Sequence, residues 1–129
     1  MAGLILDASA LIAMLRSEPG GDVVADTLGE ARMSVVNHAE VVSHYARAGG
    51  DAAAIAAMLR PLPIALVKAD GDLAMEAGLL AALTEPAGLS LGDRFCLALA
   101  KREGLPAWTA DRAWARIADA VGVEVRVIR

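Results

Sequence analysis

The sequence has few aromatic residues and a single cysteine. Only 3% of the 129 residues are aromatic although 57% are hydrophobic, so the core has to be built largely from Ala, Leu, Val and Ile. The lone Cys96 excludes an internal disulfide and a cysteine-rich zinc site, and suits a reducing compartment. We therefore expect closely packed helices made of small apolar residues, with Cys96 as a core residue on one of them.

The chain also lacks a basic excess, a long apolar run and a basic N-terminal segment. Its formal net charge is -4, so nucleic acid would have to be bound through local basic side chains or metal ions rather than a generally positive surface. No apolar run approaches the roughly 18 residues of a membrane span, and no basic segment precedes the first apolar run as in a signal peptide. We expect a cytoplasmic protein with no membrane contact.

Short apolar runs alternate with helical stretches along the whole chain. At 129 residues there is room for one core, so we expect a single domain over residues 1–129. The expected strands are 4–6, 33–36, 64–67, 107–109 and 123–128, and the expected helices start at Ser9, Asp22, Asn37, Asp51, Asp72, Ser90 and Asp111. Such alternation predicts an α/β fold, here a three-layer α/β/α sandwich with a mostly parallel central sheet.

The apolar excess also bears on partners. A small domain with this composition would leave apolar surface uncovered, which favours a homodimer or another partner interface. The apolar helices over 11–15 and 51–59 are candidate surfaces, although burial in the core explains each of them equally well.

Four acidic residues stand where expected strands end or expected helices begin. Asp7 follows the first apolar run and Asp111 follows the strand over 107–109, while Glu40 and Asp93 each fall in the first turn of an expected helix. In an open α/β sheet, ligands bind beyond the carboxyl ends of the strands. Because parallel strands bring these positions to one edge, the four carboxyl groups are candidates for a common site.

Helix capping is the competing interpretation for three of these acids. The capping positions are Asn37-x-x-Glu40, Ser90-x-x-Asp93 and, directly before a helix, Asp111. Capping explains Asp7 less well, because Ser9 is available as the cap of the helix that follows it. A non-catalytic interaction protein whose acids only cap helices is therefore an alternative.

If the four acids do meet, their chemistry points to a divalent cation. Crowded carboxylates raise one another's pKa unless a cation neutralises them. Oxygen ligands without His or Cys suit hard ions, so Mg²⁺ or Mn²⁺ is favoured over zinc. Such a centre activates a water and stabilises the charge that develops on a phosphate during in-line displacement.

Four stretches carry a resemblance to a known family. In chain order they are LILDASAL, VVNHAEV, LSLGDRFCLALAKREGLP and WTADRAW. Together, and at this chain length, they resemble PIN-domain ribonucleases and specifically the VapC-type toxins of type II toxin–antitoxin systems. The resemblance covers essentially the whole chain. It implies a parallel sheet sandwiched by helices, Mg²⁺- or Mn²⁺-dependent endoribonuclease activity on RNA, and a cognate antitoxin that covers the site.

Matched position by position, the catalytic and metal-binding residues are Asp7, Glu40, Asp93 and Asp111. The resemblance implies Asp7 and Asp93 as the main direct ligands. Glu40 either orients the attacking water or binds the metal itself, and Asp111 completes the pocket directly or through water. Ala113 stands where many relatives carry a further acid, which leaves open whether one metal or two act.

Four polar residues accompany the acids. Ser9 and Thr109 match positions where hydroxyls hold the carboxylates in place. Arg94 and Arg112 directly follow two of the acids and are candidates for contacts with RNA phosphates, although solvated helix arginines are an equal alternative.

Other candidates fit less well. His38 and His44 are six positions apart, which does not place them on one helix face as a metal pair, and Trp108 and Trp114 suit core packing better than base stacking. A receiver-like phosphoacceptor domain is a second alternative, but the paired acids of its first strand end and the lysine after its last strand are absent. A haloacid-dehalogenase-like phosphatase would need Asp in place of Ser9.

Overall fold

One sheet of five parallel strands organises residues 3–129, which the computed structural model describes. The strands are β1 (Leu4–Leu6), β2 (Ala31–Ser34), β3 (Ala65–Val67), β4 (Ala107–Thr109) and β5 (Val125–Val127), in the order β3-β2-β1-β4-β5. The predicted α/β fold with a parallel sheet is therefore confirmed. The single domain predicted over 1–129 includes Met1 and Ala2, which lie outside the described residues.

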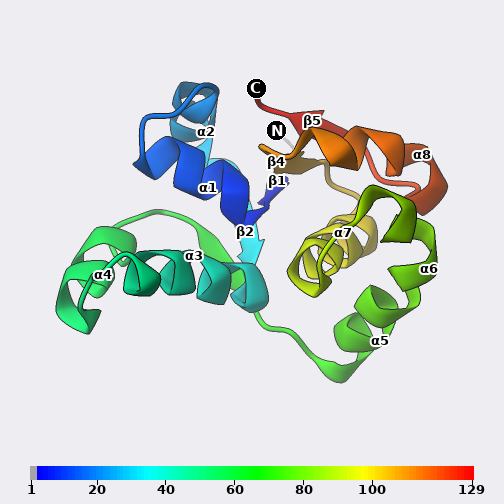
Figure 1. Cartoon of the computed structure of the whole chain (residues 1–129), viewed down its shortest axis with the longest axis horizontal. Coiled ribbons are helices and arrows are strands. Elements are labelled where there is room, and N and C mark those ends of the chain that lie inside the picture. Colours follow the sequence, from blue (N-terminus) through cyan, green and yellow to red (C-terminus); the bar gives the residue numbers. More distant parts are fainter. Residues whose placement is uncertain (1–2) are drawn as a thin grey trace.

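Helices cover both faces of this sheet (Figure 1). They are α1 (Ala8–Leu15), α2 (Gly21–Asp26), α3 (Val35–Arg47), α4 (Ala52–Leu59), α5 (Gly71–Leu79), α6 (Ala81–Thr84), α7 (Leu91–Glu103) and α8 (Ala118–Val121), with 3₁₀ turns η1 (Leu28–Glu30), η2 (Glu85–Ala87) and η3 (Arg112–Arg116). Helices α1 to α4 lie on one side of the sheet and α5 to α8 on the other. Within residues 3–129, no helix has the length and apolarity that crossing a membrane requires.

The central strand β1 separates two apolar cores. Leu4 and Leu6 pack with residues of α1, α3 and α4, whereas Ile5 faces the core that contains α5 and α7. All three side chains are at most 2% exposed, and burying each contributes about 1.5–3 kcal/mol. The strand that ends at Asp7 is therefore firmly fixed. Cys96 is buried on α7 as expected.

Three predicted helices are interrupted, and two predicted strands are shorter, since β3 covers 65–67 rather than 64–67 and the last strand is also shortened. The helix expected from Asp22 to Glu30 ends at Asp26, because the Thr27 hydroxyl donates to the carbonyls of Val23 and Val24 and a 3₁₀ turn follows. The stretch 72–83 is divided between α5 and α6, the helix after Asp111 between η3 and α8, and the last strand covers 125–127 rather than 123–128.

The junction between β2 and α3 differs most from the prediction. The strand expected over 33–36 ends at Ser34, whose hydroxyl accepts the backbone N–H of Val36 at 3.1 Å and so caps α3. Asn37, predicted to be the cap, is instead the third residue of α3 and is fully buried. Glu40 consequently lies in the second turn of the helix rather than the first.

Candidate active site

The four acids surround the carboxyl edge of the central strands. Asp7 directly follows β1, and Asp111 stands two residues beyond the end of β4. Glu40 comes from α3 and Asp93 from the first turn of α7, two helices that pack against each other. Charge interactions link Asp7 with Glu40 and Asp93, and Asp93 with Asp111. The structure thus brings together carboxyl groups that are up to 104 positions apart in the chain.

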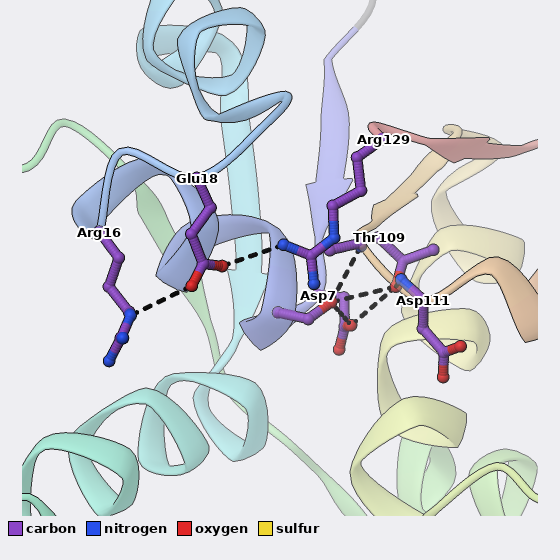
Figure 2. A network of polar contacts seen from close by, with 8 residues as sticks. Asp7, Arg16, Glu18, Thr109, Asp111 and Arg129 are labelled. Atoms are coloured by element: carbon purple, nitrogen blue, oxygen red, sulfur yellow. Dashed lines mark hydrogen bonds and ion pairs between the residues drawn. The ribbon is translucent and has the colours of Figure 1, made fainter.

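Asp7 is the most deeply buried of these acids. Its side chain is 3% exposed, and its Oδ2 accepts hydrogen bonds from Ser9 Oγ at 2.6 Å and Thr109 Oγ1 at 2.9 Å (Figure 2). Burial raises the pKa of Asp7 to about 6, the two hydroxyls oppose this rise, and the nearby Asp93 and Glu40 add to it. The carboxyl group is held in one orientation and has no cation to balance its charge among residues 3–129.

Ser9 and Thr109 join the end of β1 to the end of β4. The two hydroxyl oxygens are 3.2 Å apart, Ser9 Oγ accepts the N–H of Ala110, and Thr109 Oγ1 accepts the N–H of Asp111. The prediction that Ser9 caps this helix is wrong, because Ser9 is the second residue of α1. Asp7 occupies the cap position and makes no side-chain capping bond. The Ser9 hydroxyl is free to bind Asp7 because the cap of α1 lies two residues earlier than expected, at Asp7.

Glu40 is held by an amide rather than by a helix N-terminus. Asn37 Nδ2 donates to Glu40 Oε1 at 2.8 Å, so the predicted Asn37-x-x-Glu40 capping box is wrong. Burial raises the pKa of Glu40, the bond from Asn37 lowers it, and Asp93 raises it further. Glu40 therefore has no role in capping.

Asp93 caps a helix and belongs to the acidic group at the same time. The predicted capping box with Ser90 is confirmed: the Ser90 N–H donates to Asp93 Oδ2 at 2.9 Å, and the Asp93 N–H donates to Ser90 Oγ at 3.2 Å. Burial nevertheless raises the pKa of the Asp93 carboxyl despite these bonds, with Asp111 adding to the rise and Arg94 opposing it.

Asp111 lies at the exposed rim and caps the turn η3. Its Oδ1 accepts the N–H of Ala113 at 2.9 Å. A hollow of about 650 Å³ opens beside it, lined on one side by Arg112 and Arg129. Arg129 itself pairs with Glu18, which also pairs with Arg16, as Figure 2 shows.

The four carboxyl groups share one arrangement of hydrogen bonds. Each has one oxygen bound by a protein donor and a second oxygen that accepts no hydrogen bond from residues 3–129. The bound oxygen fixes the group, and the other is available to a ligand. Neighbouring carboxyl groups raise one another's pKa, and their oxygens are the kind of ligand that Mg²⁺ and Mn²⁺ prefer.

A cation could be held by these four acids only if their side chains move closer together. As the side chains stand, no three acidic, histidine or cysteine side chains of the described chain converge closely enough to form a ready-made metal site. A bound cation would therefore have to draw the free oxygens toward one another.

Of the other predicted residues, Arg94 lies near Asp93 and Arg112 lies on the rim. Arg94 is half-buried, and its Nε has no partner in the described part of the chain. Arg112 donates from Nε to the carbonyl of Arg129. Trp108 and Trp114 are buried, which confirms that they are core residues.

Two residues of the site were not predicted as such from the sequence. Asn37 was recognised only as a helix cap, and Gly92 only as part of the motif LSLGDRF, yet both contact Glu40 or the space that it occupies. No periodicity could identify them, because the contact joins α3 to α7 across 55 positions of sequence.

Comparison with known proteins decides the family. The family model described as "PIN domain" matches residues 4–120. The chain belongs to the PIN-domain family. This result confirms the resemblance seen in the sequence, and it does not support the receiver-domain alternative.

Solved structures share the PIN fold over nearly the whole chain. A DNA-bound VapBC from Salmonella typhimurium is 16% identical, with a TM-score of 0.70 and 98% of each chain covered. A toxin–antitoxin complex from Klebsiella pneumoniae is 18% identical, with a TM-score of 0.66, over 89% of this chain and 92% of the other. VapBC-1 from nontypeable Haemophilus influenzae is 18% identical, with a TM-score of 0.67, over 95% and 96%. A comparison with curated proteins finds no match.

Proposed function

We propose that this PIN-domain protein is a Mg²⁺- or Mn²⁺-dependent endoribonuclease and the toxin of a toxin–antitoxin pair. The observation that carries the proposal is the set of four carboxyl groups, each anchored through one oxygen with the other left available. Family membership and the toxin–antitoxin complexes among its structural neighbours support the same activity. Burial is the main reason for the elevated pKa values of Asp7, Glu40 and Asp93, and the charges of the neighbouring acids raise these values further.

The burial and position of each of the four acids indicate a different role in binding the metal or the water. A bound Mg²⁺ or Mn²⁺ would neutralise the cluster and lower the pKa of a water. Asp7 and Asp93, which are close to each other and partly or fully buried, would hold it. Glu40 would orient the attacking water or add a ligand, and Asp111, exposed at the rim, would complete the pocket on the side that RNA approaches.

The basic side chains nearest the acids supply the contacts for RNA. Arg112 lines the hollow beside Asp111, and Arg94 lies next to Asp93. Guanidinium groups bind phosphate oxygens in a bidentate manner. With a net charge of -4, the protein would depend on such local contacts to hold the phosphates on either side of the cleaved bond.

A protein partner is the second part of the proposal. Helices α1 and α4, which the sequence marked as candidate interaction surfaces, line a hollow of about 520 Å³ through Leu11, Ile55 and Leu59. We assign to this chain a cognate antitoxin, as in its structural neighbours, and a homodimeric toxin. An antitoxin that places a basic side chain among the acids would offset their repulsion in place of the metal.

The test is cleavage of structured RNAs by the purified protein with Mg²⁺, with Mn²⁺ and with a chelator. We expect cuts at defined positions that require the cation and disappear in Asp7→Asn, whose fold is checked by circular dichroism. Cutting that persists in the chelator, or no cutting under any condition, would contradict the mechanism. Unchanged cutting by Asp7→Asn would remove the acid cluster from it, and a folded, inactive wild type would favour the non-catalytic alternative.

A further inference from the structure

The side chain of Asn37 connects α3 to α7 at the position of Glu40. Its Nδ2 donates one hydrogen bond to Glu40 Oε1 at 2.8 Å and another to the carbonyl oxygen of Gly92 at 2.9 Å. Both amide hydrogens are therefore used. The side chain is completely buried, and its Oδ1 has no partner among the residues that the structure describes. A buried amide with an unused acceptor is unfavourable for folding alone, so its two donor contacts call for an explanation.

Gly92 leaves the space that the Glu40 carboxyl group occupies. A Cβ built on Gly92 would overlap both carboxyl oxygens of Glu40 and its Cδ. The backbone of Gly92 is not in the left-handed region, so conformational freedom does not require glycine here. Glycine in a helix is also less stable than alanine. The residue is explained by the close approach of Glu40 to the start of α7.

Glu40 needs such support because of its neighbours. Its side chain has three rotatable bonds, burial raises its pKa, and repulsion from the nearby Asp93 adds to that rise. Without a donor on α3 and room at α7, the repulsion would turn the carboxyl group away toward solvent. The amide of Asn37 offers a neutral donor, which attracts Glu40 without adding a positive charge that would compete with a cation.

We infer that Asn37 and Gly92 are positioning residues that together seat the Glu40 carboxylate against the N-terminus of α7. The inference rests on the proposed function, since it explains how one acid of the cluster is kept in reach of the others. Asn37 supplies the hydrogen bond, and Gly92 supplies the space. Neither residue contacts substrate; both act through Glu40.

The first arm of the test compares Gly92→Ala with Gly78→Ala. Gly78 lies within α5 and has open space where a Cβ would be added, so the control makes the same substitution in a helix without displacing anything. We expect Gly92→Ala to lower both kcat for RNA cleavage and the Mn²⁺ affinity measured by calorimetry by about 10–100-fold, the usual effect of losing a group that orients a metal-binding residue. The KM of the Gly92→Ala protein for RNA should be unchanged. The Gly78→Ala protein should keep the wild-type kcat, KM and Mn²⁺ affinity. Equal behaviour of the two alanine variants would overturn the inference.

The second arm asks whether Asn37 acts through Glu40. Asn37→Ala is made in the wild type and in Glu40→Gln, with Asn37→Ser as the variant that keeps a donor hydroxyl should the alanine protein fail to fold. We expect a loss of about 10–100-fold in Mn²⁺ affinity in the wild type and almost none in the Glu40→Gln background, because residues that act as a unit are not additive. Equal losses in both backgrounds would show that Asn37 only joins α3 to α7, and would overturn the inference.

Unfolding of the metal-free variants separates this inference from the proposed function. If Asn37 and Gly92 seat Glu40, their substitutions couple in urea unfolding with Glu40→Ala, which removes both the hydrogen-bond acceptor and the bulk of the side chain, whether or not RNA is cut. If the unfolding energies are coupled in a protein that neither cleaves RNA nor binds Mn²⁺, the positioning role of Asn37 and Gly92 stands and the proposed ribonuclease activity is rejected. If they are additive in a protein that does cleave RNA, the ribonuclease activity stands and the positioning role is rejected.

Discussion

The N-termini of α5 and α7 each carry an aspartate that stabilises a helix end, and the pKa values of these two carboxyl groups move in opposite directions. Asp70 accepts the N–H of Leu73 at 2.8 Å and lies 3.3 Å from Arg102 Nη1. That backbone bond, helped by the guanidinium, holds the pKa of Asp70 below its usual value. Asp93 accepts the N–H of Ser90 at 2.9 Å, yet burial and Asp111 raise its pKa.

The difference shows that capping and function are not alternatives for one residue. Both aspartates accept a backbone N–H, so the capping bond does not separate them. What separates them is that Asp70 is exposed and has a cation beside it, whereas Asp93 is half-buried among other acids. A carboxyl group held where its charge is unfavourable lowers the stability of the metal-free protein, and a bound cation would recover that energy.

The largest expected effect is the difference in RNA cleavage between a variant without the Asp93 charge and a variant without the Asp70 charge. Asp93→Asn keeps an oxygen that can accept the Ser90 N–H but loses the charge, so we expect RNA cleavage to fall by at least about 10²-fold, as when one group that stabilises transition-state charge is lost. Asp70→Asn keeps its cap in the same way and should cleave RNA at the wild-type rate. Initial rates at saturating Mg²⁺ measure both, and similar losses in the two variants would mean that the acids of α7 have no special role.

The pH dependence of stability is the next largest effect. Asp7 has a pKa near 6 in the folded protein against 3.8 when unperturbed, chiefly because it is buried, so the folded state binds more protons between these values. Its contribution to stability is full below about pH 4 and is lost as the pH rises through 6. The loss is up to about 3 kcal/mol. Asp7→Asn, which carries no charge, should therefore unfold at higher urea concentration than wild type at pH 8, with the advantage gone at pH 4.

Two further measurements complete that prediction. Adding Mg²⁺ at pH 8 should stabilise the wild type and leave Asp7→Asn unchanged. Asp70→Asn should show the opposite trend, because a lowered pKa makes the charged form the stabilising one. A pH-independent difference between Asp7→Asn and wild type would show that packing, rather than the buried charge, sets the stability.

The sequence was sufficient to predict Asp93 and Asp7 in their places because the information is local. A serine three residues before an acid at the start of an apolar helix is a capping box, and an acid that ends a buried strand at the centre of a parallel sheet has one edge at which to lie. The sheet followed from the same alternation of strands and helices. These features depend on neighbours in sequence.

The remaining features depend on residues that are distant in sequence. Val35 and Val36 suit a strand as well as a helix, and the Ser34 cap decides between them in favour of the helix. This shift moved Asn37 from a predicted cap to a buried bond with Gly92, 55 positions away. The raised pKa of Asp93 likewise depends chiefly on burial and further on the charge of Asp111, and only the folded chain establishes both.

Removing the caps alone gives the smallest effect and isolates their contribution. Ser90→Ala and Asp51→Ala each delete a side-chain oxygen that accepts a helix N-terminal N–H, at 3.2 Å in α7 and 2.8 Å in α4, so each should lower the free energy of unfolding by about 1 kcal/mol. Asp93 would still accept the backbone N–H of residue 90, and RNA cleavage by Ser90→Ala should remain within a few-fold of wild type, as should cleavage by Asp51→Ala. Urea unfolding and initial rates measure the two quantities separately. If Ser90→Ala lost as much activity as Asp93→Asn, the cap and not the crowded charge would be what distinguishes the start of α7 from the start of α5.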